Sequence, residues 1–198
     1  MTVILASQSP QRKALMETLG IPFEIMPAAL DEKAITAATQ VERAEKVARA
    51  KAEVVSQQLA DAQPAIIIAA DTYVVDGEAA LEKPESLDEA RDMLRRQSGR
   101  TLVAYSGFCY LDQTHGIDYS TTVKTESTFR ELSDEEIDRY VTTQPVRTWS
   151  AAFSPAYVEG MALVAAVNGS LTSFTHGLPM EELIPLLRQS GVIPGDQP

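Results

Sequence analysis

The stretch LASQSPQRK, residues 5–13, contains the change of pattern from which the fold can be read. The apolar residues that end at Leu5 are typical of a short buried strand. Ser9 and Pro10 then have the chemistry of a helix N-cap and of a first helical position, so we expect a helix to begin at Pro10. This junction predicts a strand that leads directly into a helix N-terminus.

The sequence on the C-terminal side of this junction continues to alternate between strand and helix patterns. Two S-x-x-E capping boxes, at Ser86 and Ser133, mark further helix starts. Because strands and helices alternate without strict βαβ units, we expect an α/β fold with a mixed sheet rather than a Rossmann sheet. The expected helices cover 41–59, 86–97, a segment after 133, and about 180–189; the expected strands cover 3–5, 66–75, 101–111, 117–129 and 157–167.

The composition limits the classes of function. The chain has 198 residues, of which 44% are hydrophobic, so it can fold as one domain over residues 1–198 without disulfides. A net charge of −11 argues against binding to a nucleic-acid polymer. A lone cysteine and two histidines cannot build a zinc site. No apolar stretch approaches the ~20 residues of a membrane helix, and no signal-peptide pattern is seen, so we expect a cytoplasmic protein with no membrane partner.

The segment from Ser7 to Lys13 can form an anion site. Free N–H groups at a helix N-terminus attract anions, and the hydroxyls of Ser7 and Ser9 with the cation of Arg12 would complete a phosphate cradle. Read alone, the segment also fits a capped helix with solvated Arg12 and Lys13, and this simpler interpretation is favoured until the other motifs are considered.

Two acidic positions and two lysines are further candidates. Glu32 lies in a polar loop and could bind Mg²⁺ or Mn²⁺, which prefer oxygen ligands. Asp71 directly follows five apolar residues, which indicates a strand end of the kind where α/β active sites gather. Lys51 and Lys83 could contact an anion. The alternatives are a solvated loop acid, a turn-forming aspartate and two surface lysines.

The order of these motifs resembles that of the Maf-like nucleotide pyrophosphatases over nearly the whole chain. The motifs are LASQSPQR (5–12), DE (31–32), ARAKA (48–52), ADTYVV (70–75), EKP (82–84), SGR (98–100), LSDEEI (132–137) and GLP (177–179). The resemblance implies a two-lobed fold related to the inosine triphosphatases, in which a long twisted mixed sheet spans both lobes and the substrate lies in the cleft between them. It also implies a homodimer, and a divalent metal, Mg²⁺ or Mn²⁺, that assists cleavage of a nucleoside triphosphate into the monophosphate and pyrophosphate.

Carried over by position, the resemblance assigns roles to individual residues. Asp71 matches the catalytic acid, expected to orient or deprotonate the attacking water. Glu32 matches a residue expected to hold the metal together with Asp71. The remaining matches form the polar and cationic wall around the triphosphate: Ser7, Ser9, Arg12, Lys51 and Lys83.

The C-terminal third departs from the family pattern, and this bears on the base. A usual lysine segment is replaced by 145–160, and no lysine follows Lys124. Pro-x-Arg-Lys at 10–13 and Glu159-Gly160 resemble the branch that acts on 7-methylguanosine triphosphate. Glu159 could accept hydrogen bonds from that base, and Trp149 could offer an aromatic face to its positive charge. The alternatives are core packing for Trp149 and a solvated strand position for Glu159.

Two functions of different classes remain open at this stage. The first is the pyrophosphatase. The second is a catalytically weak nucleotide-binding regulator of cell division or septum formation. Retention of Asp71, Glu32, Lys51 and Lys83 together favours the enzyme, whereas the altered segment 145–160 favours the regulator.

Overall fold

The computed structural model describes residues 2–59, 64–77 and 79–194. Within these ranges the strands form a seven-stranded sheet of order β2-β1-β3-β5-β6-β7, with β4 paired to β3. Strand β1 pairs in parallel with β2 and β3, whereas β4 and β7 pair antiparallel with β3 and β6. This confirms the predicted mixed sheet. The strands are β1 Thr2–Leu5, β2 Glu24–Ile25, β3 Ala65–Asp76, β4 Ala79–Leu81, β5 Thr101–Asp112, β6 Ile117–Phe129 and β7 Val164–Asn168.

Three helices, α1, α3 and α4, begin where the capping residues Ser9, Ser86 and Ser133 predict them. Ser9 accepts the N–H of Arg12 at the start of α1, and Ser133 forms a full capping box with Glu136 at the start of α4. Short 3-10 turns cover Glu32–Ala34, Val146–Thr148 and Ser150–Ala152. The helices are α1 Pro10–Glu17, α2 Gln40–Gln58, α3 Leu87–Gln97, α4 Asp134–Thr143, α5 Val158–Met161, α6 Leu171–His176 and α7 Met180–Gln189.

The chain divides into two compact units. Unit 1 comprises Met1–Thr72, Ser106–Val123 and His176–Pro198, and unit 2 comprises Tyr73–Tyr105 and Lys124–Thr175. The two predicted lobes with a cleft between them, and the assignment of 1–198 as one domain, stay predictions.

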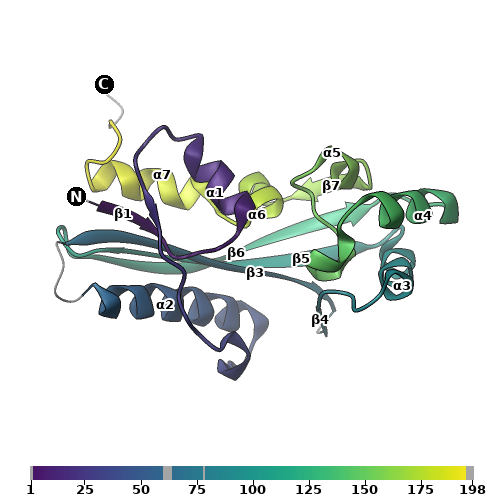
Figure 1. The fold of residues 1–198 in the computed structure, drawn as a ribbon, viewed down its shortest axis with the longest axis horizontal. Helices are drawn as coiled ribbons and strands as arrows, with labels where there is room; N and C mark the ends of the chain where they lie inside the picture. The colour runs from purple at the N-terminus through teal and green to yellow at the C-terminus, as the bar shows by residue number, and fades with distance from the viewer. Residues whose placement is uncertain (1, 60–63, 78, 195–198) are drawn as a thin grey trace. The chain divides into compact units, whose positions relative to one another are not determined.

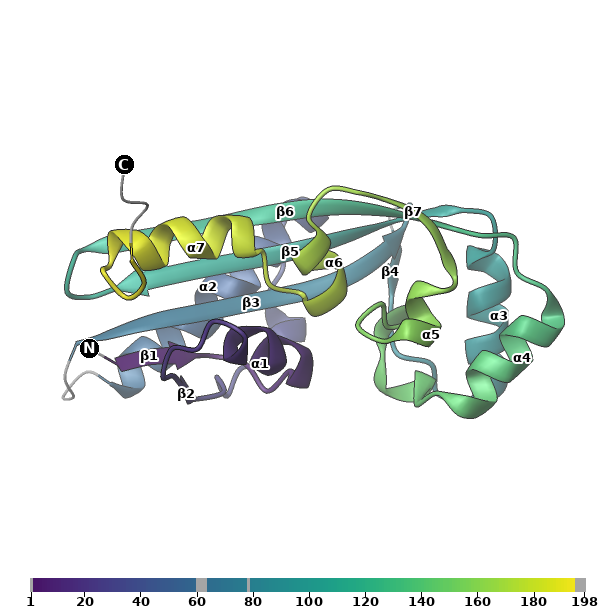
Figure 2. The ribbon, with the colours of Figure 1, turned by 90° about the horizontal axis from the view of Figure 1, so that it is seen from above.

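In unit 1, helices cover both faces of the sheet. Helix α2 lies on one face, and α1 and α7 lie on the other (Figures 1 and 2). Alternate residues of β3 face opposite ways: Ile66 and Ile68 join the core beneath α1 and α7, while Ile67 packs in the core beneath α2. A strand that is buried on both faces has a continuous apolar sequence, which explains the run at 65–70.

In unit 2, α3 and α4 lie side by side, as Figures 1 and 2 both show. They pack on a core that includes Leu94 of α3, Leu102 of β5 and Ile137 of α4. Phe129 and Phe153 meet edge to face in the same core, with ring centroids 4.9 Å apart.

Two local predictions are wrong. The segment 157–167 was expected to be one strand, but it contains α5 before β7 begins at Val164. The backbone N–H groups of Met161 and Ala162 bond to carbonyls four residues earlier, which satisfies them locally. A short apolar run does not decide between helix and strand, so its pattern was ambiguous. The interpretation of Asp71 as a strand end is also wrong, because Asp71 lies inside β3, which continues through 73–75 as the pattern predicted and ends at Asp76.

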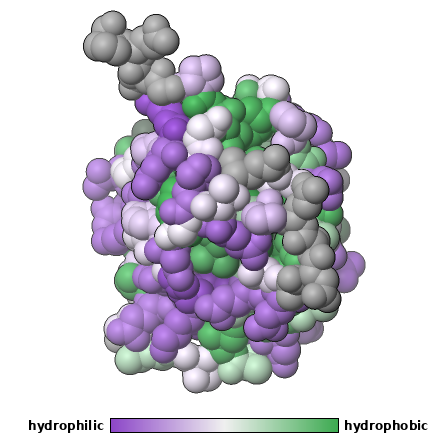
Figure 3. Space-filling model, turned by 90° about the vertical axis from the view of Figure 1, so that its left-hand side faces the viewer, coloured by the Kyte–Doolittle hydropathy of each residue, from purple (hydrophilic) through white to green (hydrophobic). Residues whose placement is uncertain are grey.

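One face of the molecule is largely polar (Figure 3). Among the residues that the structure describes, no helix has both the length and the apolar sequence needed to cross a membrane. The face shown in Figure 3 is covered mainly by hydrophilic residues, with smaller apolar patches between them.

Candidate functional site

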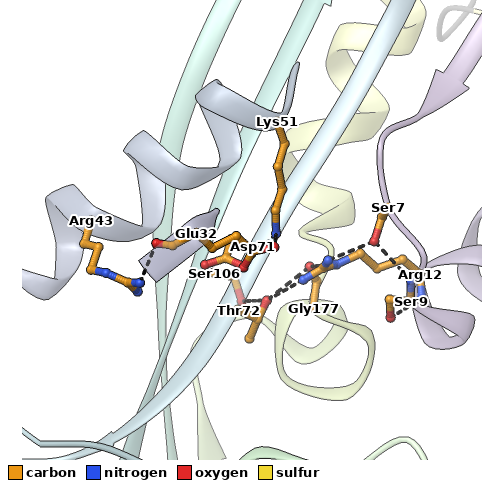
Figure 4. Close-up of polar contacts among 10 residues, drawn as sticks. All are labelled: Ser7, Ser9, Arg12, Glu32, Arg43, Lys51, Asp71, Thr72, Ser106 and Gly177. Atoms are coloured by element: carbon orange, nitrogen blue, oxygen red, sulfur yellow. Dashed lines mark hydrogen bonds and ion pairs between the residues drawn. The ribbon is translucent and has the colours of Figure 1, made fainter. Parts of the chain in front are cut away.

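The centre of the candidate site is an ammonium group held by two carboxylates. Lys51 Nζ lies 2.9 Å from Asp71 Oδ1 and 2.9 Å from Glu32 Oε1 (Figure 4). Lys51 comes from α2, Asp71 from β3 and Glu32 from the 3-10 turn before α2. All three residues belong to unit 1. The side chains of Lys51 and Asp71 are nearly buried, whereas that of Glu32 is half-exposed.

The secondary structure explains why Lys51 and Asp71 meet. Lys51 lies on the buried face of α2, between Ala48 and Ala52 of the core beneath that helix. Asp71 follows Ile67 and Ala69 by the two-residue period of a strand, so it points to the same face. The apolar contact between α2 and β3 therefore ends in an ion pair.

Glu32 is positioned through its backbone. Asp31 accepts the N–H of Lys33 and thereby caps the turn that carries Glu32. Arg43 of α2 donates from Nη2 to the carbonyl oxygen of Glu32 at 3.0 Å and from Nε to that of Ile35 at 3.2 Å. No sequence pattern indicates this role of Arg43, because the role depends on how the loop folds back on the helix.

Arg12 forms a second polar cluster on the face of α1 and α7. Its guanidinium donates to Gly177 O at 3.0 Å, to Ser7 Oγ at 3.0 Å and to Thr72 Oγ1 at 3.2 Å (Figure 4). Thr72 Oγ1 in turn lies 3.1 Å from Ser106 Oγ. Burial lowers the pKa of Arg12 from its ordinary value, and the negative charges of Asp71 and Glu32 oppose this shift. The buried guanidinium of Arg12 is thus hydrogen-bonded to groups of the protein itself.

Gly177 is the position at which this cluster demands a glycine. Its φ is +68°, and a Cβ there would lie 2.8 Å from Thr72 Oγ1 and 3.2 Å from Arg12 Nη2. Thr72 and Ser106 were not singled out as site residues from the sequence, since their side chains gain a role only through Arg12. The GLP motif at 177–179 was the one available signal for Gly177.

A pocket of about 270 Å³ adjoins the lysine–carboxylate contact. It lies where β1 ends and α1 begins, so it is next to the free N–H groups of the helix N-terminus. Ser9 donates to Gln11 Oε1 and accepts the N–H of Arg12, which holds its hydroxyl at this edge. The lining combines the predicted polar residues with small ones: Ala6, Ser7, Gln8, Ser9, Arg12, Pro27, Ala28, Glu32 and Lys51.

Five predicted site residues therefore line one pocket: Ser7, Ser9, Arg12, Glu32 and Lys51. Asp71 joins them through its ion pair with Lys51. This places six of the nine candidates in unit 1. Their roles stay predictions, but the arrangement combines cations, hydroxyls and acids as a phosphate-cleaving site requires.

The other three predicted site residues belong to unit 2. Lys83 is exposed between β4 and α3. Trp149 stacks on Tyr157 with ring centroids 5.3 Å apart, and it also packs against the core of unit 2. Glu159 is exposed in α5, and its charge adds to the burial that raises the pKa of Tyr140 to about 12. Their contacts with a substrate stay predictions.

The two acids at Lys51 fit a magnesium or manganese site of the substrate-assisted kind. Such ions are commonly held by one or two carboxylates, and substrate phosphates and water provide the other ligands. Glu32 and Asp71 present oxygens to one common point, which Lys51 Nζ marks. Within the described ranges, no group of three or more His, Cys, Asp or Glu residues is arranged to hold a metal. The donor set thus suits a metal that arrives with phosphates rather than one fully caged by protein.

Comparisons with known proteins bear on this site. The chain matches the family model for Maf-like proteins over residues 2–190. It is 33% identical to a dTTP/UTP pyrophosphatase of Syntrophus aciditrophicus, over 98% of this chain and 94% of the relative. It is 31% identical to a 7-methyl-GTP pyrophosphatase of Nitrosococcus oceani, over 96% of this chain and 94% of the relative. Among solved structures, a HAM1 protein from Coxiella burnetii aligns with 96% of this chain and 99% of its own, at 17% identity and a TM-score of 0.48.

Proposed function

Since the chain belongs to the Maf-like family, we propose that it hydrolyses a nucleoside triphosphate to the monophosphate and pyrophosphate. The observation that carries the proposal is the contact of Lys51 with Asp71 and Glu32 beside a pocket lined by hydroxyls and a helix N-terminus. A pocket of this kind can hold phosphates and place a carboxylate next to them.

In this reaction a water oxygen attacks the α-phosphorus, and the bond from that phosphorus to the bridging oxygen of pyrophosphate breaks. Asp71 orients the water or takes its proton, as a carboxylate in a largely buried position can. Glu32 and Asp71 would hold a magnesium or manganese ion, which when bound offsets negative charge on the phosphate oxygens.

The cations and hydroxyls of the pocket bind the triphosphate. Lys51 supplies a nearly buried positive charge, and Ser7 and Ser9 supply hydroxyls at the N-terminus of α1. Arg12 contributes its charge and also holds Ser7 in place through the 3.0 Å hydrogen bond. Lys83 remains a further proposed phosphate contact.

The test is a product assay on the purified protein. UTP, dTTP, GTP and 7-methyl-GTP are offered with Mg²⁺ or Mn²⁺, and pyrophosphate and phosphate are measured separately. We expect pyrophosphate and monophosphate in equal amounts, and no turnover in EDTA. Release of single phosphates as the main product, or full activity in EDTA, contradicts the proposal.

Two kinds of base are to be separated by this panel. Several relatives named dTTP/UTP pyrophosphatase favour a pyrimidine, and one named 7-methyl-GTP pyrophosphatase favours a methylated purine. In this chain the exposed Glu159 and the partly buried Trp149 support 7-methyl-GTP, since a carboxylate and an aromatic face suit a cationic base. Glu159→Gln should lower kcat/KM for 7-methyl-GTP more than for UTP. Native preference for UTP or dTTP discards the methylated base and leaves the pyrophosphatase proposal intact.

The alternative function, a catalytically weak regulator of cell division, finds no support in the names of these relatives. Binding of triphosphates without turnover of any of them would favour it. A cytoplasmic location and a homodimer stay predictions, and light scattering of the purified protein would test the latter.

A further inference from the structure

Lys51 holds together the two carboxylates that the proposed function assigns to a metal. Its Nζ lies 2.9 Å from an oxygen of each acid, so one ammonium fills the point on which Glu32 and Asp71 converge. Only 11% of the Lys51 side chain and 13% of the Asp71 side chain are exposed, so solvent screens the contact between them weakly, whereas the Glu32 side chain is 47% exposed. A divalent cation that used the same oxygens would have to displace the ammonium.

The formal charges of Lys51, its two acids and Arg12 balance. The two acids contact Lys51, and the negative charges of both also act on the buried guanidinium of Arg12, where they oppose the lowering of its pKa by burial. Two negative and two positive groups leave no net charge to attract a free dication. A dication beside an undisplaced Lys51 would also meet a like charge at close range, which is costly where water is largely excluded.

A metal that is already bound to a triphosphate changes this balance. The complex is anionic overall, and its phosphate oxygens offer Lys51 new partners. Lys51 can then exchange carboxylate oxygens for phosphate oxygens, while Glu32 and Asp71 exchange the ammonium for the metal. Every charged group keeps a partner of opposite sign, as groups withdrawn from water require.

We infer that Lys51 is a stand-in cation, which makes the protein take up its metal together with the triphosphate and not before it. The inference rests on the proposed function for the assignment of Glu32 and Asp71 to the metal. Lys51 therefore acts twice: it positions the two acids before binding, and it contacts phosphate afterwards.

The test is a titration of the nucleotide-free protein with Mn²⁺, followed by the EPR signal of the aqueous ion. Lys51→Met removes the charge and keeps much of the stem, so we expect it to bind Mn²⁺ on the order of tenfold or more tightly than the native protein. Lys51→Arg keeps the charge and should bind Mn²⁺ as weakly as the native protein does. The double variant Lys51→Met/Asp71→Asn should lose the gain, which locates the ion. Lys13→Met, at an exposed lysine of α1, is the matched control and should change nothing.

A second measurement uses the native protein alone, so the test survives if a Lys51 variant fails to fold. Inorganic triphosphate, which carries no base, is added at saturation, and Mn²⁺ binding is corrected for its affinity for free triphosphate. We expect tighter Mn²⁺ binding to the protein with triphosphate than without it. Equal Mn²⁺ affinity with and without triphosphate overturns the inference. So does a folded Lys51→Met protein that binds Mn²⁺ no better than the native one. Neither readout requires turnover, so failure of the proposed reaction appears separately, in the product assay.

Discussion

Unit 1 and unit 2 both contain cations that are each shared by two acids, but the two groups differ in burial. In unit 1, Lys51 and Asp71 are nearly buried and Glu32 is half-exposed, next to a pocket. In unit 2, Arg91 and Arg95 of α3 each bond one aspartate of their own helix and one of α4 at the surface. Water surrounds these surface pairs, so each contributes little to stability. The buried contact concentrates charge where a substrate can use it, and this marks a functional site better than the number of ion pairs does.

Among the substitutions that test this difference between the units, we expect the largest loss of activity at Asp71. Asp71→Asn keeps the shape of the side chain but removes the charge and the basicity. We expect kcat to fall on the order of 10²-fold or more, as for a positioned general base. Thermal unfolding should still be cooperative, because Glu32 continues to pair with Lys51. Near-normal turnover with the correct product would show that the role of Asp71 is assigned wrongly.

Arg12→Ala tests whether the second buried cluster of unit 1 holds the site together. The change removes three hydrogen bonds, while Ser7 Oγ keeps the N–H of Ser9, Thr72 Oγ1 keeps Ser106, and Gly177 O keeps a longer bond from Thr72. We expect the free energy of unfolding in urea to fall by about 2–4 kcal/mol, because three buried hydrogen bonds and the packing of the side chain are lost. Lys13→Ala, one residue along and exposed, is the control and should leave it unchanged. An equal, small effect of both variants would mean that the Arg12 cluster does not stabilise unit 1.

Gly177→Ala probes the same cluster from the other side. A methyl group at this positive φ would press on Thr72 Oγ1 and Arg12 Nη2, so we expect a loss of about 1–3 kcal/mol in the free energy of unfolding. Thr72→Ala removes the closest atom, so the same glycine substitution should cost less in that background. Additive effects of the two changes in a double-mutant cycle would contradict the contact.

Lys83→Ala tests whether functional cations are confined to unit 1, because Lys83 is exposed and belongs to unit 2. If it contacts phosphate, kcat/KM should fall about tenfold through the loss of one charge-assisted hydrogen bond, with Tm unchanged. Lys83→Arg should restore part of the loss. Unaltered kinetics would confine the phosphate contacts to the cations of unit 1.

The smallest effect is expected at the surface pairs of unit 2. Arg95→Ala removes the bonds to Asp92 and Asp134, which water can replace. We expect a small decrease in Tm that shrinks further in high salt, and unchanged kcat. A large, salt-independent loss of stability in differential scanning calorimetry would mean that these pairs matter as much as the buried ones.

The sequence predicted the local structure best where a residue type has one specific structural role, such as serine at a helix N-cap. Ser9 and Ser133 marked helix starts by their capping chemistry, and both begin the helices expected of them. The sequence-based predictions failed where one pattern is compatible with two kinds of local structure. The apolar segment around Glu159 forms a helix followed by a strand, and Asp71, interpreted as lying at a strand end, lies inside β3.

The family membership was predicted and is confirmed, because it depends on motifs in order rather than on any contact. The contacts of the site could be predicted only as a set of candidates. Lys51 and Asp71 are 20 positions apart, and their meeting depends on which faces of α2 and β3 pack together. The role of Arg43 was missed because backbone carbonyls, its acceptors, carry no sequence signal.

The bond from Arg12 to Gly177 joins residues that are 165 positions apart, and this sets an order on assembly. During synthesis, Ser7, Glu32, Lys51 and Asp71 leave the ribosome long before Gly177 does. Until then the guanidinium of Arg12 lacks that acceptor and stays hydrated, so the wall of the pocket that it supports is incomplete. Contacts of such sequence separation form late, because a long loop must close first. The pocket that residues 6–51 line is therefore completed only after Gly177 has been made.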